Sequence, residues 1–237
     1  MAVSQHTIDG TVLTMPVRVR KADVHNAMFS VPAEAAQRLI DYSGLEVCQY
    51  RPGRAMVNLM LARYVDGDLG RYHEFGTCVT VNPPGSRARG LAALAKAATL
   101  IHHLPVDQSF TLQAGRTIWG FPKIMADFNI RENNKFGFDV SADGQLIASI
   151  DFGRGVRMPI TSKPQILKTY TFAEGTTREV PWEMKVTGLH GRIGGAAVRL
   201  GDHPYAKELA SLGLPKRAMV SVAVDNVEMT FGDAHAI

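Results

Sequence analysis

Residues 55–81 decide the fold, and they read AMVNLMLARYV (55–65), DGDLG (66–70) and RYHEFGTCVTV (71–81). Apolar and polar side chains alternate in the first and last runs, which is typical of β-strands that bury one face. Asp66-Gly67-Asp68 lies between them at hairpin spacing. The stretch therefore predicts a pair of antiparallel strands.

The same alternation recurs along most of the chain. Further strands are predicted from Thr11 to Arg18, Phe110 to Ile118, Phe136 to Val140, Leu146 to Phe152 and Ile166 to Phe172, and in a long C-terminal pair. Turn residues at Glu132-Asn133-Asn134 and Ala142-Asp143-Gly144 fall between strands at hairpin spacing. We therefore predict a mainly β (α+β) fold, an antiparallel closed or curled β-barrel with a few peripheral helices, rather than a parallel α/β layer.

Three helices are predicted beside the sheet. Pro32 suits the first turn of a helix from Ala33 to Asp41. A second helix would run from Ser86 or Gly90 to His103 and cover the sheet or meet another subunit. Its apolar face would carry Leu91, Leu94, Ala95, Ala98 and Ile101. Asp202 can cap a third helix that continues through Leu212.

The composition is that of a globular protein. Of 237 residues, 46% are hydrophobic and 20% charged, which leaves no disordered block and suits one domain over residues 1–237. The net charge of +4 would help to attract a small anionic substrate. The one basic cluster, Arg18-Val19-Arg20-Lys21, lacks stacking aromatic residues and predicts an exposed strand face, not a nucleic-acid site. No segment is apolar enough for a leader or a membrane span, so we expect a cytoplasmic protein that binds neither nucleic acid nor membrane.

Familiar metal, phosphate and nucleophile motifs are missing. Cys48 and Cys78 have no partnering motif and are expected to be buried, reduced thiols. The pair His102-His103 lacks metal-ligand spacing, so hydrogen-bonded histidines are favoured over a metal site. The run from Gly191 to Gly195 predicts a hairpin turn and not a phosphate loop. We expect neither a metal nor a cofactor.

A second stretch, Gly115-Arg116-Thr117-Ile118-Trp119-Gly120-Phe121-Pro122-Lys123-Ile124-Met125-Ala126, places one lysine among apolar neighbours. Burial disfavours an ammonium ion and therefore favours the neutral amine. A neutral amine can condense with a ketone to give an iminium, which stabilises a carbanion on the adjacent carbon. The alternative is that the apolar residues are core and that Lys123 reaches water with only its stem buried.

The segment from Gly115-Arg116 to Lys123 resembles the lysine motif of the acetoacetate decarboxylase family. Leu69-Gly70-Arg71-Tyr72-His73-Glu74 is similar to the strand that carries a catalytic glutamate in that family. The C-terminal part follows the family's order of elements, with Asp202-His203, Gly213-Leu214-Pro215 and the strand-like run from Ala218 to Val224. The resemblance implies that Lys123 forms a Schiff base and that Glu74 moves protons. A carboxyl group in a partly apolar cavity suits that work, but without the resemblance an exposed strand residue or an ion-pair partner is the simpler reading of Glu74.

The chain departs from the family pattern at three places. Ile124 stands where the family has a second lysine, and we expect its bulk to add to the desolvation of Lys123. Asn58 and Leu59 lie near the place of a second acidic residue. The family's N-terminal substrate-binding arginine has no clear counterpart, although Arg18, Arg20 and Lys21 lie in that region.

The resemblance implies a Schiff-base-forming carbon–carbon lyase, a homo-oligomer, that decarboxylates a small 3-oxo acid. The alternatives are aldol and dehydration chemistry on a 2-oxo acid through the same lysine, or a barrel that binds a small ligand without catalysis. Trp119 and Phe121 are expected in the wall of the substrate pocket or the core. Arg116 would bind either a substrate carboxylate or a backbone carbonyl. We also expect that replacing Lys123 with alanine leaves no unpaired charge.

Overall fold

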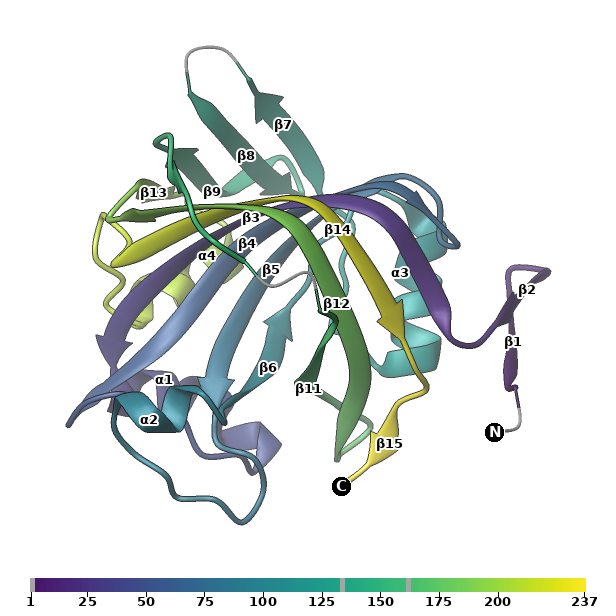
Figure 1. Cartoon of the computed structure of the whole chain (residues 1–237), viewed down its shortest axis with the longest axis horizontal. Helices are drawn as coiled ribbons and strands as arrows, with labels where there is room; N and C mark the ends of the chain where they lie inside the picture. The colour runs from purple at the N-terminus through teal and green to yellow at the C-terminus, as the bar shows by residue number, and fades with distance from the viewer. Residues whose placement is uncertain (1–2, 133–134, 161–162) are drawn as a thin grey trace.

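Seven strands of the computed structural model close into a barrel (Figure 1). The structure describes residues 3–132, 135–160 and 163–237. Around the barrel the order is β12-β11-β6-β5-β4-β3-β14, and β14 pairs with β12 to complete the circle. The strands are β3 (Val17–Pro32), β4 (Arg54–Gly67), β5 (Tyr72–Val81), β6 (Ala98–His103), β11 (Gln165–Ala173), β12 (Thr176–Ile193) and β14 (Val220–Phe231). Neighbours are antiparallel except β6 and β11, which are parallel. The predicted closed barrel is confirmed, and its sheet is mixed.

A separate four-stranded sheet, in the order β13-β9-β8-β7, covers part of the barrel. It consists of β7 (Asp127–Arg131), β8 (Phe136–Ala142), β9 (Gln145–Phe152) and β13 (Ala196–Leu200). The remaining strands are β1 (Gln5–Ile8), β2 (Thr11–Thr14), β10 (Val156–Arg157) and β15 (His235–Ala236). β1 and β2 form a hairpin, and β10 and β15 pair with β12.

The helices are short. They are α1 (Ala33–Ile40), η1 (Asp41–Ser43), α2 (Leu91–Leu94), α3 (Ser109–Ala114), the π-helical η2 (Gly115–Trp119) and α4 (Pro204–Ser211). Within the described residues, no helix is long and apolar enough to cross a membrane. The first and third predicted helices correspond to α1 and α4, although His203 and not Asp202 caps α4, because its Nδ1 accepts a hydrogen bond from Tyr205 N at 3.1 Å.

Two predicted elements are wrong. The segment from Ser86 or Gly90 to His103 is not one helix: only Leu91–Leu94 is helical, and Ala98–His103 is strand β6. This strand lies in the middle of the barrel sheet and is buried on both faces, so it lacks the alternation that marks a half-buried strand. Phe110 to Ile118 is helical and not a strand, because Gln108 caps α3 through its Oε1, which accepts from Thr111 N at 2.7 Å. The β-branched and aromatic residues of this segment are common in strands, and they led to the wrong prediction.

Other boundaries shift without changing the fold. The strand predicted from Thr11 to Arg18 is divided between β2 and the start of β3. Gly194 and Gly195 turn the chain from β12 into β13, which lie in different sheets, so this turn does not close a hairpin. Asn133 and Asn134 of the predicted turn lie outside the described residues.

Alternation along β4 and β5 separates two cores. Leu59, Leu61 and Phe75 point outward and are buried against the four-stranded sheet, α1 and α4. Met60 and Ala62 point into the barrel. Because successive side chains of a strand point to opposite faces, Glu74 of β5 points inward, beside Tyr72 and away from Phe75.

Candidate active site

An irregular extended segment brings Lys123 next to Glu74. Val106, which follows β6, forms an antiparallel bridge with Glu74 on one side and a parallel bridge with Met125 on the other. Val106 N donates to Ile124 O and Ala126 N donates to Val106 O, both at 2.9 Å. The segment around Val106 thus continues the barrel wall next to Glu74, and the lysine segment lies on its other side. Two residues 49 positions apart in the sequence therefore face the same interior.

Lys123 is almost fully buried, with 2% of its surface exposed, and its amine is held by polar groups. Nζ lies 2.8 Å from Glu74 Oε2 and donates to Thr111 Oγ1 at 2.9 Å. Tyr64 donates to the other carboxyl oxygen of Glu74 at 2.9 Å. Nζ also lies 5.2 Å from the ring centre of Tyr72, within range of a cation–π contact. The arrangement joins an amine, a carboxyl group and a phenol in one hydrogen-bonded chain.

The turn before Lys123 depends on two glycines. A Cβ on Gly115 would lie 2.6 Å from both Cδ and Cε of Lys123, so only glycine leaves room for the lysine stem. Gly120 ends η2 with φ of 69°, a left-handed conformation that glycine adopts without strain. Lys123 N then donates to Phe121 O at 2.8 Å across Pro122. These constraints direct the side chain of Lys123 inward.

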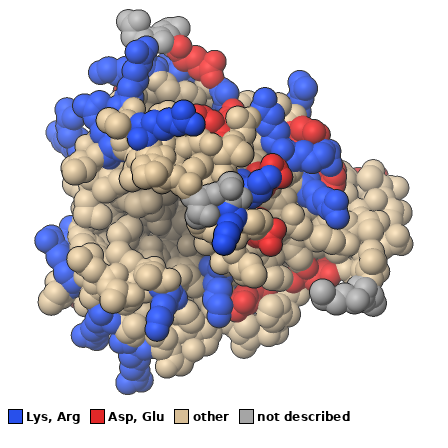
Figure 2. Space-filling view, in the orientation of Figure 1, with Lys and Arg blue, Asp and Glu red and all other residues tan. Residues whose placement is uncertain are grey.

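A cavity of about 430 Å³ leads from this cluster through the barrel. Its wall includes Trp119 and Phe121, as the sequence predicts, and is otherwise mostly apolar. Among the described residues, Glu74 and Lys123 are the charged groups that line it. Figure 2 shows a hollow on the face seen in Figure 1, with walls free of charged side chains and with lysines and arginines around it.

Burial sets the protonation of the groups around the amine. It raises the pKa of Tyr64 and Tyr72 well above the usual value, and the nearby Glu74 carboxylate raises both further. Burial also raises the pKa of Cys78 to about 12. The two phenols therefore remain protonated hydrogen-bond donors near neutral pH, and Cys78 remains an unreactive thiol.

Comparison with known proteins identifies the family. The family model described as acetoacetate decarboxylase (ADC) matches residues 6–235. The chain belongs to the acetoacetate decarboxylase family. No curated protein sequence matches it significantly.

Solved structures share the fold of this acetoacetate decarboxylase family member at low sequence identity. An acetoacetate decarboxylase from Legionella pneumophila subsp. pneumophila str. Philadelphia 1 is 18% identical, with a TM-score of 0.65 over 94% of this chain and 87% of that one. The enduracididine biosynthesis enzyme MppR complexed with pyruvate is 15% identical, with a TM-score of 0.65 over 94% and 91%. An acetoacetate decarboxylase-like enzyme from Sphingomonas wittichii RW1 is 12% identical, with a TM-score of 0.60 over 100% of both chains.

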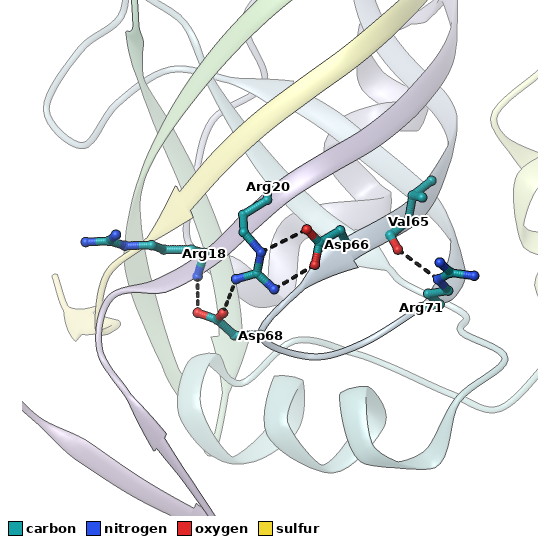
Figure 3. A network of polar contacts seen from close by, with 6 residues as sticks. All are labelled: Arg18, Arg20, Val65, Asp66, Asp68 and Arg71. Carbon is teal, nitrogen blue, oxygen red and sulfur yellow. Dashed lines mark hydrogen bonds and ion pairs between the residues drawn. The ribbon is translucent and has the colours of Figure 1, made fainter.

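The N-terminal basic residues lie outside the barrel. Val17 and Val19 of β3 line the cavity, so the alternating Arg18 and Arg20 point the other way. Arg20 pairs with Asp66 at 2.7 Å and with Asp68 at 2.6 Å (Figure 3). These two carboxylates raise the pKa of Arg20. Lys21 is exposed and is absent from the cavity wall. None of the three basic residues reaches the cavity.

Arg116 contacts a backbone carbonyl. Its Nε and Nη2 donate to Lys123 O at 2.8 and 2.5 Å, and its side chain lies on the exposed side of the turn. Of the two roles expected from the sequence, the structure shows this one, and Arg116 does not line the cavity. The guanidinium fixes the backbone of Lys123 from outside.

Two departures from the family pattern have different structural outcomes. Asn58 lines the cavity, whereas Leu59 points to the outer core. Ile124 is half-buried against the outer core and does not line the cavity. Ile124 does not face the amine from within the cavity, because alternation turns its side chain away, and its contribution to the desolvation of Lys123 stays a prediction. Trp119, Phe121, Leu104 and Tyr72 supply the apolar lining.

Sequence reasoning missed Tyr64, Tyr72 and Thr111. Tyr64 and Tyr72 were within reach of a pattern argument, because they share the inward face of β4 and β5 with Glu74 and directly oppose each other in register. Thr111 had no such signal, since its segment was assigned to a strand.

His102 and His103 both contact Glu208 of α4, at 3.2 and 2.5 Å from Nε2. Tyr42 OH is 2.9 Å from His102 Nδ1. Hydrogen bonds from the two histidines hold the pKa of Glu208 well below its usual value. The three side chains could reach a common metal ion, and each has a hydrogen-bonding or ionic partner within the group.

Proposed function

We propose that the protein is a lyase that forms a Schiff base between Lys123 and the carbonyl group of an oxo compound, with Glu74 as the proton donor and acceptor. The observation that carries this proposal is the buried amine of Lys123, 2.8 Å from a buried carboxyl group in an apolar cavity. An amine used only for structure would need no cavity in front of it.

The first step follows from the contacts of Lys123. Glu74 accepts a proton from the ammonium group across 2.8 Å, and the neutral amine adds to the carbonyl carbon. Loss of water from the resulting carbinolamine, with Glu74 returning the proton to the leaving oxygen, gives the iminium. Hydrogen bonds from Tyr64 to Glu74 and from Lys123 to Thr111 hold both reacting groups in place.

For a 3-oxo acid, the iminium supports decarboxylation. The bond between the carboxylate and the adjacent carbon breaks, CO₂ leaves, and the electron pair moves through an enamine to the lysine nitrogen. Glu74, which has meanwhile taken up a proton from solvent water, protonates the enamine carbon, and water hydrolyses the new iminium to release the ketone and the Lys123 amine. The iminium nitrogen is the electron sink, so these reaction steps require no cofactor.

A second reaction starts from the same kind of iminium. With a 2-oxo acid, the Glu74 carboxylate would take a proton from the carbon beside the iminium to give an enamine. The enamine would attack an aldehyde to form a new carbon–carbon bond, and loss of water would give a conjugated product. MppR has been seen with the condensation product of pyruvate and imidazole 4-carboxaldehyde, which supports this chemistry on a similar fold. Both reactions depend on Lys123.

Reductive trapping tests the shared step. Incubation with a methyl ketone and sodium borohydride should add the reduced ketone to Lys123, because hydride converts the iminium to a stable secondary amine. Peptide mass spectrometry locates the adduct. Lys123→Met should abolish it, and Lys207→Met, at an exposed position on α4, should not. Absence of an adduct at Lys123, or equal labelling of other lysines, would leave only a ligand-binding barrel.

The fold of the lysine variant needs its own control. The expectation that removing the Lys123 amine leaves no unpaired charge is wrong, because Glu74 is its buried ionic partner. Breaking a buried pair costs about 3–5 kcal/mol of stability. The double variant Lys123→Met/Glu74→Gln removes both charges, so it should regain stability while remaining unable to form the adduct.

A further inference from the structure

We infer that the natural substrate is an oxo compound with an extended apolar chain or ring, and that it carries no charged group away from the carbonyl that would need a cation other than Lys123. This inference rests on the proposed Schiff base at Lys123 and specifies what binds in front of it. Three features of the cavity carry it: its length, its wall and the position of the arginines.

The cavity is long compared with a small oxo acid. Glu74 lies opposite Ala62, and Asn58, four residues further along β4, lies opposite Cys78. At about 3.3 Å per residue, Asn58 is roughly 13 Å from the reacting end. Tyr72, Glu74 and Lys123 are buried, whereas Met28 and Asn58 are half-exposed. The cavity is therefore closed at the amine and more open at the far end, so a carbonyl head enters first.

The wall between the two ends is apolar and partly adaptable. Trp182 stacks on Phe231 with parallel rings 5.4 Å apart, and Trp119 lies 6.0 Å from Phe231. Four methionines complete much of the remaining wall: Met28, Met60, Met184 and Met229. Methionine side chains adjust to ligands of different shape. A four-carbon oxo acid would leave most of this wall without a partner, whereas an apolar body would bury it.

The cavity offers a carboxylate no cation besides the amine that must react. Arg18 and Arg20 point outward, and Arg116 is engaged with the Lys123 carbonyl outside the wall. No arginine lines the cavity in the part of the chain that the structure describes. An ionised group bound in this site away from Lys123 would be costly.

A series of methyl ketones tests the inference on the full-length protein. Acetone, 2-pentanone, 2-heptanone and 2-nonanone would be compared by the initial rate of borohydride-dependent labelling at Lys123. If each added methylene is buried, the binding free energy becomes more favourable by about 0.8 kcal/mol. This corresponds to a rise of roughly fourfold per methylene in the second-order rate constant of labelling. Levulinate, which ends in a carboxylate, should react at least tenfold more slowly than 2-hexanone. Rates that do not depend on chain length, or levulinate reacting as fast as 2-hexanone, would overturn the inference.

Two variants locate the effect. Met184→Trp would fill the half-exposed part of the cavity and should abolish the gain with chain length. Met158→Trp, at a position that is 45% exposed and outside the cavity wall, should keep the gain.

Failure of the inference is distinguishable from failure of the Schiff base. If no ketone labels Lys123, quenching of Trp119 and Trp182 fluorescence still measures non-covalent binding. Affinity that rises from acetone to 2-nonanone would then support the apolar substrate class and reject the Schiff base. Labelling of Lys123 by all four ketones at one rate would instead support the Schiff base and reject the apolar substrate class.

Discussion

The inward and outward faces of β4 and β5 are built from the same two strands but differ in what they bury. The outward face is filled: Leu59, Leu61 and Phe75 are fully buried against a second sheet and two helices. The inward face borders a cavity of about 430 Å³ and holds a buried ion pair, Lys123 with Glu74. One alternating sequence thus produces a dense core on one side and an unfilled space with a buried ion pair on the other.

This difference separates stability from chemistry. Filled apolar packing supplies most of the free energy of folding. A buried ion pair in contact with a cavity contributes little net stability, since the cost of removing charges from water offsets their attraction. We therefore expect substitutions on the outward face to change stability most, and substitutions around the amine to change reactivity most.

The largest expected effect is on reactivity and comes from Gly115→Ala. The new methyl group would lie 2.6 Å from two carbons of the Lys123 stem, so the amine must move. A displacement of about 1 Å can reduce a reaction rate roughly 100-fold, and borohydride labelling of Lys123 should fall by that order. Gln113→Ala, at an exposed position of α3, is the matched control. A labelling rate within twofold of wild type would show that the lysine stem adapts.

Next in size is the loss of stability from Phe138→Ala on the outward side. Phe138 is fully buried, with its ring centre 5.7 Å from that of Phe75. Truncation of a buried phenylalanine costs about 3–5 kcal/mol. Met60→Ala, which enlarges a space that already exists, should cost less than half as much. Urea unfolding of the two variants measures the contrast, and equal losses would contradict the division between the faces.

A pH-dependent effect is expected at His25, on the outward face of β3. His25 stacks on Phe136 of the second sheet at 3.6 Å between ring centres. Burial, with a smaller contribution from Arg63, lowers its pKa from 6.5 to about 4. The unfolded chain therefore binds a proton at a higher pH than the folded protein does. The free energy of unfolding should fall as the pH is lowered from 6.5 to 4, by up to about 3 kcal/mol.

The variant His25→Leu should lose this pH-dependent contribution while keeping an apolar contact with Phe136. Chemical unfolding at several pH values between 4 and 7 compares the two proteins. A slope in this range that is the same for wild type and variant would assign the pH dependence to other groups.

The alternation of apolar and polar residues predicted the barrel, because most of its strands bury one face and so show this pattern. It failed for Ala98–His103, which is covered on both faces, and for Phe110 to Ile118, where the side-chain cap from Gln108 determines the helix. The parallel pairing of β6 with β11 joins residues about 70 apart in the sequence, and no local pattern encodes it. Register of this kind depends on the closure of the whole sheet.

Part of the candidate site was also predictable from the sequence. Lys123 and Glu74 were found through the resemblance of their segments, and alternation then places Tyr64 and Tyr72 beside Glu74. The contact with Thr111 and the outward positions of Arg116 and Ile124 depend on the turn after η2. That turn combines a π-helix with a left-handed glycine, which residue propensities do not specify.

The smallest expected effect comes from removing one buried hydroxyl group on each face. Tyr64 donates to the Glu74 carboxyl group inside the barrel, and Tyr205 OH lies 2.5 Å from Thr77 Oγ1 on the outward side. Both are buried, so phenylalanine at either position removes one hydrogen bond and keeps the ring. A hydrogen bond to a charged group contributes about 1.5–3 kcal/mol, and a neutral one about 0.5–1.5 kcal/mol.

Tyr64→Phe should therefore lower the free energy of unfolding more than Tyr205→Phe, as measured by urea denaturation near neutral pH. In the background Glu74→Gln, where the acceptor is neutral, the difference should shrink to within error. A larger loss from Tyr205→Phe, or an unchanged difference in that background, would mean that Tyr64 does not stabilise a carboxylate.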